Sequence, residues 1–131
     1  MTRFVVDAGV AIHLARAGID IPASHQLLAP TLLRSQVLSL LHEAVQRGEV
    51  PAAVARDQLA RINAMPIRLL GDGVLRRRAW DLATTLGWSS TYNAEYVALT
   101  LLQADALVTL DAELAQSVEG IVRIASIEDL R

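Results

Sequence analysis

Arg3-Phe4-Val5-Val6-Asp7-Ala8-Gly9-Val10-Ala11 is the stretch of sequence that decides the fold. It begins with a short apolar run, which is typical of a buried strand. Asp7 ends that run, and the residues after it continue with helical spacing. In open parallel sheets, ligands collect beyond the carboxyl ends of the strands. Asp7 is therefore the first candidate for a functional residue.

Length and composition indicate one soluble domain. The chain has 131 residues, of which 53% are hydrophobic, and this is enough for a single domain over residues 1–131 with one core. No apolar stretch approaches the roughly 18 residues needed to span a bilayer, and the N-terminal residues lack the pattern of a secretion signal. We expect a cytoplasmic protein with no membrane association.

Several residue types are missing, and their absence excludes classes of chemistry. There is no cysteine, and the three histidines are dispersed, so a metal would be held mainly by oxygen. All 12 basic residues are arginine. The absence of lysine disfavours Walker A phosphate loops, Schiff-base enzymes and phospho-acceptor receiver domains. A net charge of −2 argues against indiscriminate nucleic-acid binding, although it leaves a local basic patch possible.

Apolar runs and helical patterns alternate along the rest of the chain. Alternation of this kind predicts parallel strands joined by right-handed crossovers. The fold class is therefore α/β, with helices on both faces of a central parallel sheet of four or five strands. Trp80 is expected to pack inward. The predicted strands are 4–7, 27–29, 67–70, 106–109 and 121–124, and the predicted helices are 10–17, 32–47 with Thr31 as its cap, 51–64, 74–86, 92–103 and 111–118.

Four oxygen-bearing residues lie near the end of a predicted strand or the start of the helix after it: Asp7, Gln36, Asn93 and Asp111. Because the carboxyl ends of parallel strands converge on one edge, these side chains are expected to meet there around a hard divalent cation. Mg²⁺ or Mn²⁺ in such a site activates a water that cuts phosphodiesters. Thr109 is placed to hydrogen-bond a ligand in the same pocket, or equally its own backbone.

Four segments of the sequence resemble the PIN-domain ribonucleases, in particular the VapC-type toxins of bacterial toxin–antitoxin pairs. They are Phe4-Val5-Val6-Asp7, Ser35-Gln36-Val37, Tyr92-Asn93-Ala94-Glu95-Tyr96-Val97-Ala98-Leu99 and Leu107-Val108-Thr109-Leu110-Asp111. The resemblance covers nearly the whole chain. It implies a three-layer α/β/α PIN-like fold, metal-dependent cleavage of RNA, a small antitoxin as partner and a homodimer. It also implies that Asp7, Gln36, Asn93 and Asp111 are the catalytic positions, with Asp7, Asn93 and Asp111 holding the metal.

The chain departs from the family pattern at two of these positions. The family has glutamate where this chain has Gln36, and aspartate where it has Asn93. Each amide keeps one oxygen and removes a charge, and one unit-charge attraction at about 4 Å contributes roughly 4 kcal/mol at an effective dielectric of about 20. Mg²⁺ or Mn²⁺ binding should therefore be much weaker and activity reduced or absent. Whether the amides are natural or engineered stays open.

Nearby glutamates do not replace the lost acids. Glu43 lies seven residues after Gln36, about 10 Å along the helix. Glu95 follows Asn93 by two positions, about 200° around the helix, and points elsewhere. The rival hypothesis is therefore a PIN-like module that no longer cuts and acts by binding RNA or the antitoxin.

Simpler interpretations apply to each residue taken alone. Asp7, Asn93 and Asp111 all stand where helices begin, where Asp and Asn are favoured caps. Arg34 is a candidate RNA contact, one turn from the proposed site. Arg76 to Arg78 spread over roughly 200° of a helix, so a solvated face explains them better than one RNA strand does. Tyr92 and Tyr96 have a spacing that suits base stacking but is more often found in cores.

Overall fold

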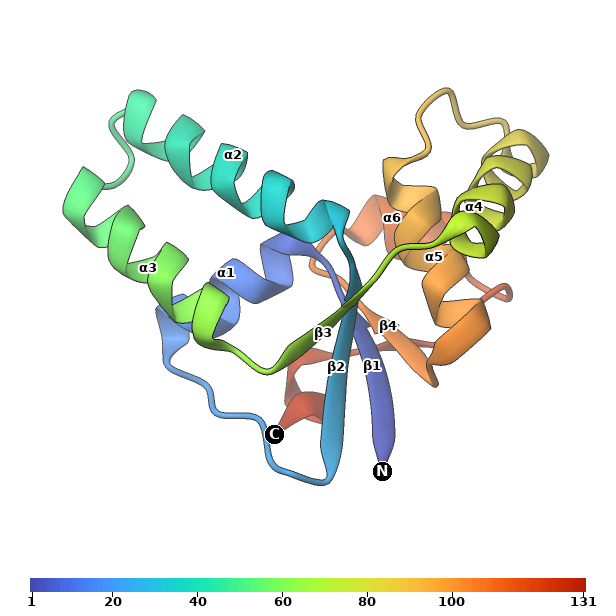
Figure 1. Cartoon of the computed structure of the whole chain (residues 1–131), viewed down its shortest axis with the longest axis horizontal. Helices are drawn as coiled ribbons and strands as arrows, with labels where there is room; N and C mark the ends of the chain where they lie inside the picture. Colours follow the sequence, from blue (N-terminus) through green and yellow to red (C-terminus); the bar gives the residue numbers. More distant parts are fainter.

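The computed structural model describes all 131 residues and has a five-stranded parallel sheet at its centre (Figure 1). The strand order is β3-β2-β1-β4-β5, with β1 in the middle. This confirms the α/β fold and sets the number of strands at five. The strands are β1 (Thr2–Val6), β2 (His25–Pro30), β3 (Ile67–Leu70), β4 (Ala106–Val108) and β5 (Ile124–Ala125).

The helices form two lobes, one on each side of the strands. Figure 1 shows α1, α2 and α3 on the left and α4, α5 and α6 on the right. β1 leads directly into α1, so its carboxyl end lies between the two lobes. The helices are α1 (Ala8–Ala17), α2 (Leu32–Gln46), α3 (Ala52–Ala64), α4 (Gly73–Leu86), α5 (Tyr92–Gln103), α6 (Ala112–Ser117) and the 3₁₀ helix η1 (Ile127–Leu130).

The side chains of β1 alternate between two cores, as the pleat of a strand requires. Val5 belongs to the larger core, together with Val97 of α5. Phe4 and Val6 belong to the smaller core on the other face, which α1 and η1 cover. Because both faces are covered, the strand reads as a continuous apolar run. The molecule therefore has the predicted three layers.

Two of the predicted helix ends are confirmed by their backbone geometry. Gly18 and Gly87 follow α1 and α4 with φ of 65° and 72°, a left-handed conformation that glycine adopts without steric cost. The predicted cap Thr31 is wrong in one respect. It occupies the capping position of α2, but its side chain makes no capping hydrogen bond, because its backbone is helical instead of extended.

Two further predictions are wrong. Trp80 is 69% exposed, because α4 buries the side that carries Leu75, Ala79 and Ala83. The last strand is β5 instead of residues 121–124, since Leu107 of β4 pairs with Ile124 and the residues before it pack against the core as a loop. No helix in the structure is both long and apolar enough to cross a membrane.

Candidate functional site

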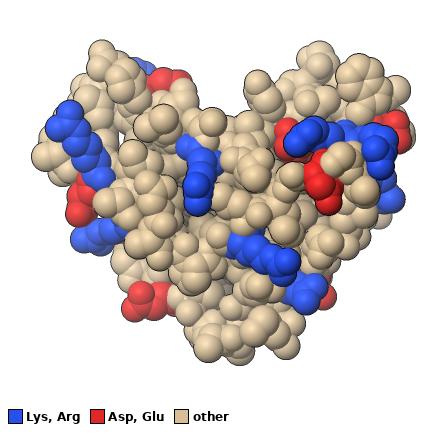
Figure 2. Space-filling model, viewed as in Figure 1, with Lys and Arg blue, Asp and Glu red and all other residues tan.

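A cleft between the two lobes is formed by two adjoining cavities. The larger, about 590 Å³, lies among α6, the start of α5 and the loop before it. The smaller, about 280 Å³, lies among α1, α2 and α5 and includes Asp7. Gln36 and Asn93 line both cavities, and Asp111 lines the larger one. The structure therefore brings together the four predicted site residues, and Figure 2 shows a hollow between the lobes.

Asp7 is held in place through both oxygens of its carboxylate. The backbone N–H of Val10 donates to Oδ1 at 3.0 Å, which caps α1, and the hydroxyl of Thr109 donates to Oδ2 at 2.5 Å. Burial raises the pKa of Asp7 above its ordinary value; the bonds from Thr109 and Val10 oppose this rise, and the charge of Asp111 adds to it. A bound cation would offset the cost of ionising this buried acid.

Thr109 links Asp7 to Asp111. Its Oγ1 accepts a hydrogen bond from the backbone N–H of Asp111 at 3.1 Å while its hydroxyl donates to Asp7. The backbone contact considered for Thr109 is therefore present, and its hydroxyl additionally holds the Asp7 side chain. Asp111 caps α6 through Oδ1, which accepts from the N–H groups of Glu113 and Leu114. Its Oδ2 makes no hydrogen bond and remains available to a ligand.

Gln36 is hydrogen-bonded to Tyr96, a residue whose spacing from Tyr92 suits base stacking but is more often found in cores. The hydroxyl of Tyr96 donates to Oε1 of Gln36 at 2.6 Å. Tyr96 is 1% exposed, and burial, followed by the charges of Asp7 and Glu95, raises its pKa far above the ordinary value of 10.0. It therefore stays protonated and acts as a donor. Its position three residues after Asn93 was the available signal, since that spacing places both on one helix face.

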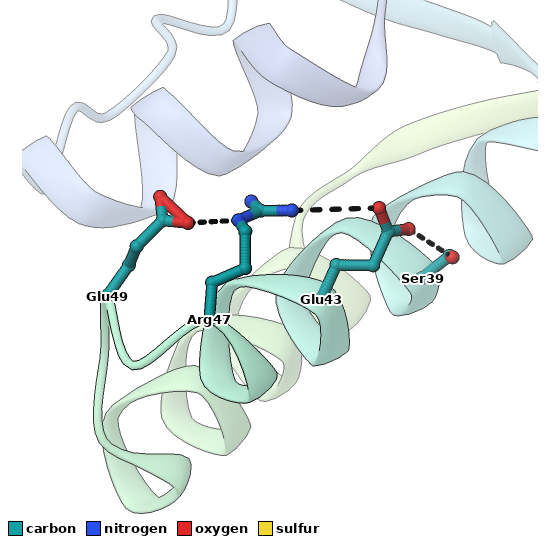
Figure 3. A network of polar contacts seen from close by, with 4 residues as sticks. All are labelled: Ser39, Glu43, Arg47 and Glu49. Carbon is teal, nitrogen blue, oxygen red and sulfur yellow. Dashed lines mark hydrogen bonds and ion pairs between the residues drawn. The ribbon is translucent and has the colours of Figure 1, made fainter.

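Glu43 also lines the smaller cavity, but a polar network holds its carboxylate. Ser39 donates to Glu43 at 2.6 Å, and the Arg47 guanidinium lies 3.8 Å from Glu43 and also bonds Glu49. Figure 3 shows these four side chains in a row along the end of α2. Glu43 is thus already partnered. Although it lies seven residues beyond Gln36, Glu43 shares this cavity with Asp7 and Gln36.

The lining of the cleft is acidic. Its charged residues are Asp7, Glu43, Asp111 and Glu113, and no arginine lines either cavity. No group of three or more His, Asp or Glu side chains is arranged to hold a metal ion. A cation here would depend on the carboxylates of Asp7 and Asp111 together with the amide oxygens of Gln36 and Asn93. Oxygen ligands of this type are those that Mg²⁺ and Mn²⁺ prefer, but this set carries only two negative charges, one from each carboxylate.

Other predicted residues have different surroundings. Arg34 is not brought to the cleft; it lines a small recess with Ile62 and Asn63 of α3. Asn93 is the second residue of α5, and Thr91 occupies the capping position, so capping explains Asp7 and Asp111 but not Asn93.

The comparison of structures finds a solved structure with a similar fold. The crystal structure of PAE2754 from Pyrobaculum aerophilum superposes with a TM-score of 0.77, covering 98% of this chain and 92% of that one, at 24% sequence identity. No protein-family model matches the sequence, and no curated protein matches it. At this level of identity, the similarity shows a shared fold: an α/β architecture with a central five-stranded parallel sheet.

Proposed function

We propose that this protein is a PIN-domain endoribonuclease of the VapC toxin type, dependent on Mg²⁺ or Mn²⁺ and weakened by its two amides. The observation that carries the proposal is the meeting of Asp7, Gln36, Asn93 and Asp111 in one cleft at the carboxyl edge of the sheet. These residues come from distant parts of the chain. Helix capping alone would not require all four to meet.

The side chains of the cleft would do most of the positioning. Thr109 and Val10 fix the Asp7 carboxylate, and the cap of α6 fixes Asp111, so both acids would be oriented before a cation arrives. When bound, Mg²⁺ or Mn²⁺ would lower the pKa of a water and neutralise charge on the scissile phosphate. The acidic lining supports this reading, because phosphates would be repelled from the cleft unless a cation lay between them and the carboxylates.

A specific contact favours the second candidate, a module that binds but does not cut. Oε1 of Gln36 already accepts a short bond from Tyr96, and an amide offers a cation no negative charge. The third and fourth ligands would then be too weak to hold the metal. In this case the fold would serve to bind RNA or an antitoxin.

The expected partners belong to the same proposal. A small antitoxin and a second copy of the chain both need apolar surface, and α2 exposes Leu38 and Leu40, which are 56% and 41% accessible. An apolar groove between α2 and α3 adjoins Leu38. A cytoplasmic location, where RNA and antitoxin would be present, is also part of the proposal.

Calorimetric titration of Mn²⁺ into the metal-free protein tests the site directly. We expect binding that disappears in Asp7→Ala and persists in Asp72→Ala. Asp72 is a matched control because its carboxylate caps α4 by the same kind of bond and does not line the cleft. Binding that survives in Asp7→Ala would contradict the assignment of the site.

RNA cleavage separates the two candidate functions. The chain is incubated with single-stranded RNA and Mn²⁺, beside the double variant Gln36→Glu, Asn93→Asp. If the protein is a weakened nuclease, slow cleavage should increase in the double variant and stop when Asp7→Ala is added. Cleavage found only in the double variant would support the binding module. No cleavage by either would count against the proposed nuclease ancestry.

A further inference from the structure

Trp80 is an exposed tryptophan on the outer side of α4. It is 69% exposed, although tryptophan is among the side chains that gain most from burial. Helix α4 does not lack a core-facing side, because Leu75, Ala79 and Ala83 provide one. The exposed indole therefore contributes nothing visible to the fold and offers a flat aromatic surface to a ligand.

Two arginines flank Trp80 on the same side of the helix. At about 100° per residue, Arg76 lies about 40° and Arg77 about 60° from Trp80, whereas Arg78 lies about 160° away. Asp81 is the one acidic residue of α4, and it falls about 100° from Trp80. We refer to Arg76, Arg77 and Trp80 together as the Trp80 face. Figure 2 shows basic side chains gathered on the lobe that contains α4, with acidic ones among them.

The positive charge of the Trp80 face lies at an unusual place, close to the N-terminus of α4. Arg76 and Arg77 lie near the N-terminus of α4, where the helix dipole disfavours positive charge. The Arg77 guanidinium lies back over that first turn, since a Cβ at Gly73 would come 3.5 Å from its Nη1. No ion pair neutralises either arginine. The Asp72 carboxylate already offsets the dipole at this end of α4, but it forms no ion pair with Arg76 or Arg77, so both guanidinium groups are free to contact a negatively charged ligand.

The Trp80 face lies near the part of α5 that lines the cleft. Helix α4 packs on α5, and Glu95 in the first turn of α5 is close enough to feel the charge of Arg76, which partly opposes the rise in its pKa caused by burial. Tyr92, at the start of α5, is 57% exposed and lines the larger cavity. The Trp80 face therefore lies on the helix that packs against the cleft-lining helix α5.

We propose that the Trp80 face binds single-stranded RNA, with a base stacked on Trp80 and the adjacent phosphates against Arg76 and Arg77. An aromatic surface beside cations matches the two recurring elements of single-strand binding, stacking and backbone charge. The inference rests on the proposed function in taking RNA as the ligand. It extends that function by giving the strand a second contact outside the acidic cleft, which itself repels phosphate.

Binding is measured in EDTA, so that neither metal nor cleavage is needed. The probe is a fluorescein-labelled oligouridylate of about 12 nucleotides, within the range of single-strand sites, followed by anisotropy at several KCl concentrations. Trp80→Ala should weaken binding roughly 5- to 150-fold, and Trp80→Phe by less, because phenylalanine keeps a stacking surface. Arg77→Gln should reduce the slope of log affinity against log salt by about 0.7.

Arg78→Gln is the matched control, since it removes the same charge from the opposite side of the same helix. It should bind RNA like the unaltered protein. In a Trp88→Phe background, stacking should also quench the fluorescence of Trp80 when the oligonucleotide is added. Urea unfolding of each variant confirms that the fold is kept, which the exposure of Trp80 leads us to expect.

Any of three binding results would overturn the inference, and one sedimentation result would do so too. The binding results are no RNA binding, equal losses in Arg77→Gln and Arg78→Gln, or undiminished binding by Trp80→Ala. A change of oligomeric state on sedimentation of Trp80→Ala would also overturn it, because Trp80 would then belong to a contact between copies. Failure of the proposed nuclease is a separate result. It would appear as absent Mn²⁺ binding and absent cleavage while RNA binding in EDTA persisted.

Discussion

Gln36 is the residue at which the two candidate functions differ most. It stands between the two cavities of the cleft and accepts a hydrogen bond from Tyr96. We predict that Gln36→Glu raises Mn²⁺ affinity at least tenfold, because a charge is added next to the other ligands and tenfold needs only about 1.4 kcal/mol. The metal-free variant should be less stable by about 1 kcal/mol, since Asp7 and the new carboxylate repel each other.

Calorimetry and urea unfolding in EDTA test both parts of this prediction. Gln46→Glu is the matched control, because it changes the same residue type on the same helix and does not line the cleft. A similar gain in affinity in both variants would show that net charge matters and the position does not. That result would contradict the assignment of the Mn²⁺ site to the cleft.

Asp7 should make the stability of the metal-free protein depend on pH. Burial raises its pKa above 3.8, so the folded chain holds this proton more tightly than the unfolded chain does. The stability contributed by the protonated acid is fully present below pH 3.8 and is lost as pH rises through the raised value. Asn cannot ionise. The stability of Asp7→Asn relative to the unaltered protein should therefore improve as pH rises from acid to neutral.

Urea unfolding across this pH range, in EDTA, measures the trend. Asp72→Asn is the control for changing a capping carboxylate to an amide at a helix start outside the cleft. Adding Mn²⁺ should reverse the advantage of Asp7→Asn at neutral pH. A stability difference independent of pH would mean that burial does not govern this carboxyl.

At the start of α6, one residue, Asp111, both caps the helix and lines the cleft. Asp111 caps this six-residue helix through Oδ1 and leaves Oδ2 open to the cleft. Asp111→Ala should cost about 1 kcal/mol of stability through the lost cap, whereas Asp111→Ser keeps a capping oxygen and should cost only a few tenths. Both should lose Mn²⁺ binding. Retained binding in Asp111→Ser, measured by calorimetry beside urea unfolding, would leave Asp111 as a cap alone.

Most element positions were predictable because local signals agreed with the fold. The apolar run before Asp7 and the glycines after α1 and α4 act through backbone and burial preferences that need no distant partner. β5 was misplaced because its start depends on pairing with Leu107, far away in sequence. The exposure of Trp80 depends on which side of α4 meets α5. Neighbouring residues do not determine either feature.

The residues of the candidate site also differ in how far the sequence predicts their surroundings. That Asp7 and Asp111 lie near one another was predictable, because the carboxyl ends of parallel strands converge at one edge of the sheet. The part played by Tyr96 was not, since its partner Gln36 lies 60 residues away on another helix and a tyrosine among apolar residues reads as core. The strand order β3-β2-β1-β4-β5, which places α2 opposite α5 across the cleft, likewise follows from long-range pairing.

For the whole molecule, the proposed metal site would link the two lobes. Gln36 comes from one lobe and Asn93 and Asp111 from the other, so a cation held by them would join α2 to α5 and α6. We predict that Mn²⁺ at tenfold its dissociation constant stabilises the fold by about 1.4 kcal/mol. For a domain of this size that corresponds to a rise in melting temperature of about 5 °C.

Hydrogen exchange with and without Mn²⁺ tests this link. Protection should increase at the starts of α1, α5 and α6 and in the first turns of α2, where the ligands are attached. The loop from Gly18 to Ser24, at the other end of the sheet, should not change, because it lies outside the cleft. In Asp7→Ala both effects should vanish. Protection that increases at α1, α5 and α6 but not in α2 would mean that the cation is held without Gln36, and that the amide at this position has left the metal site.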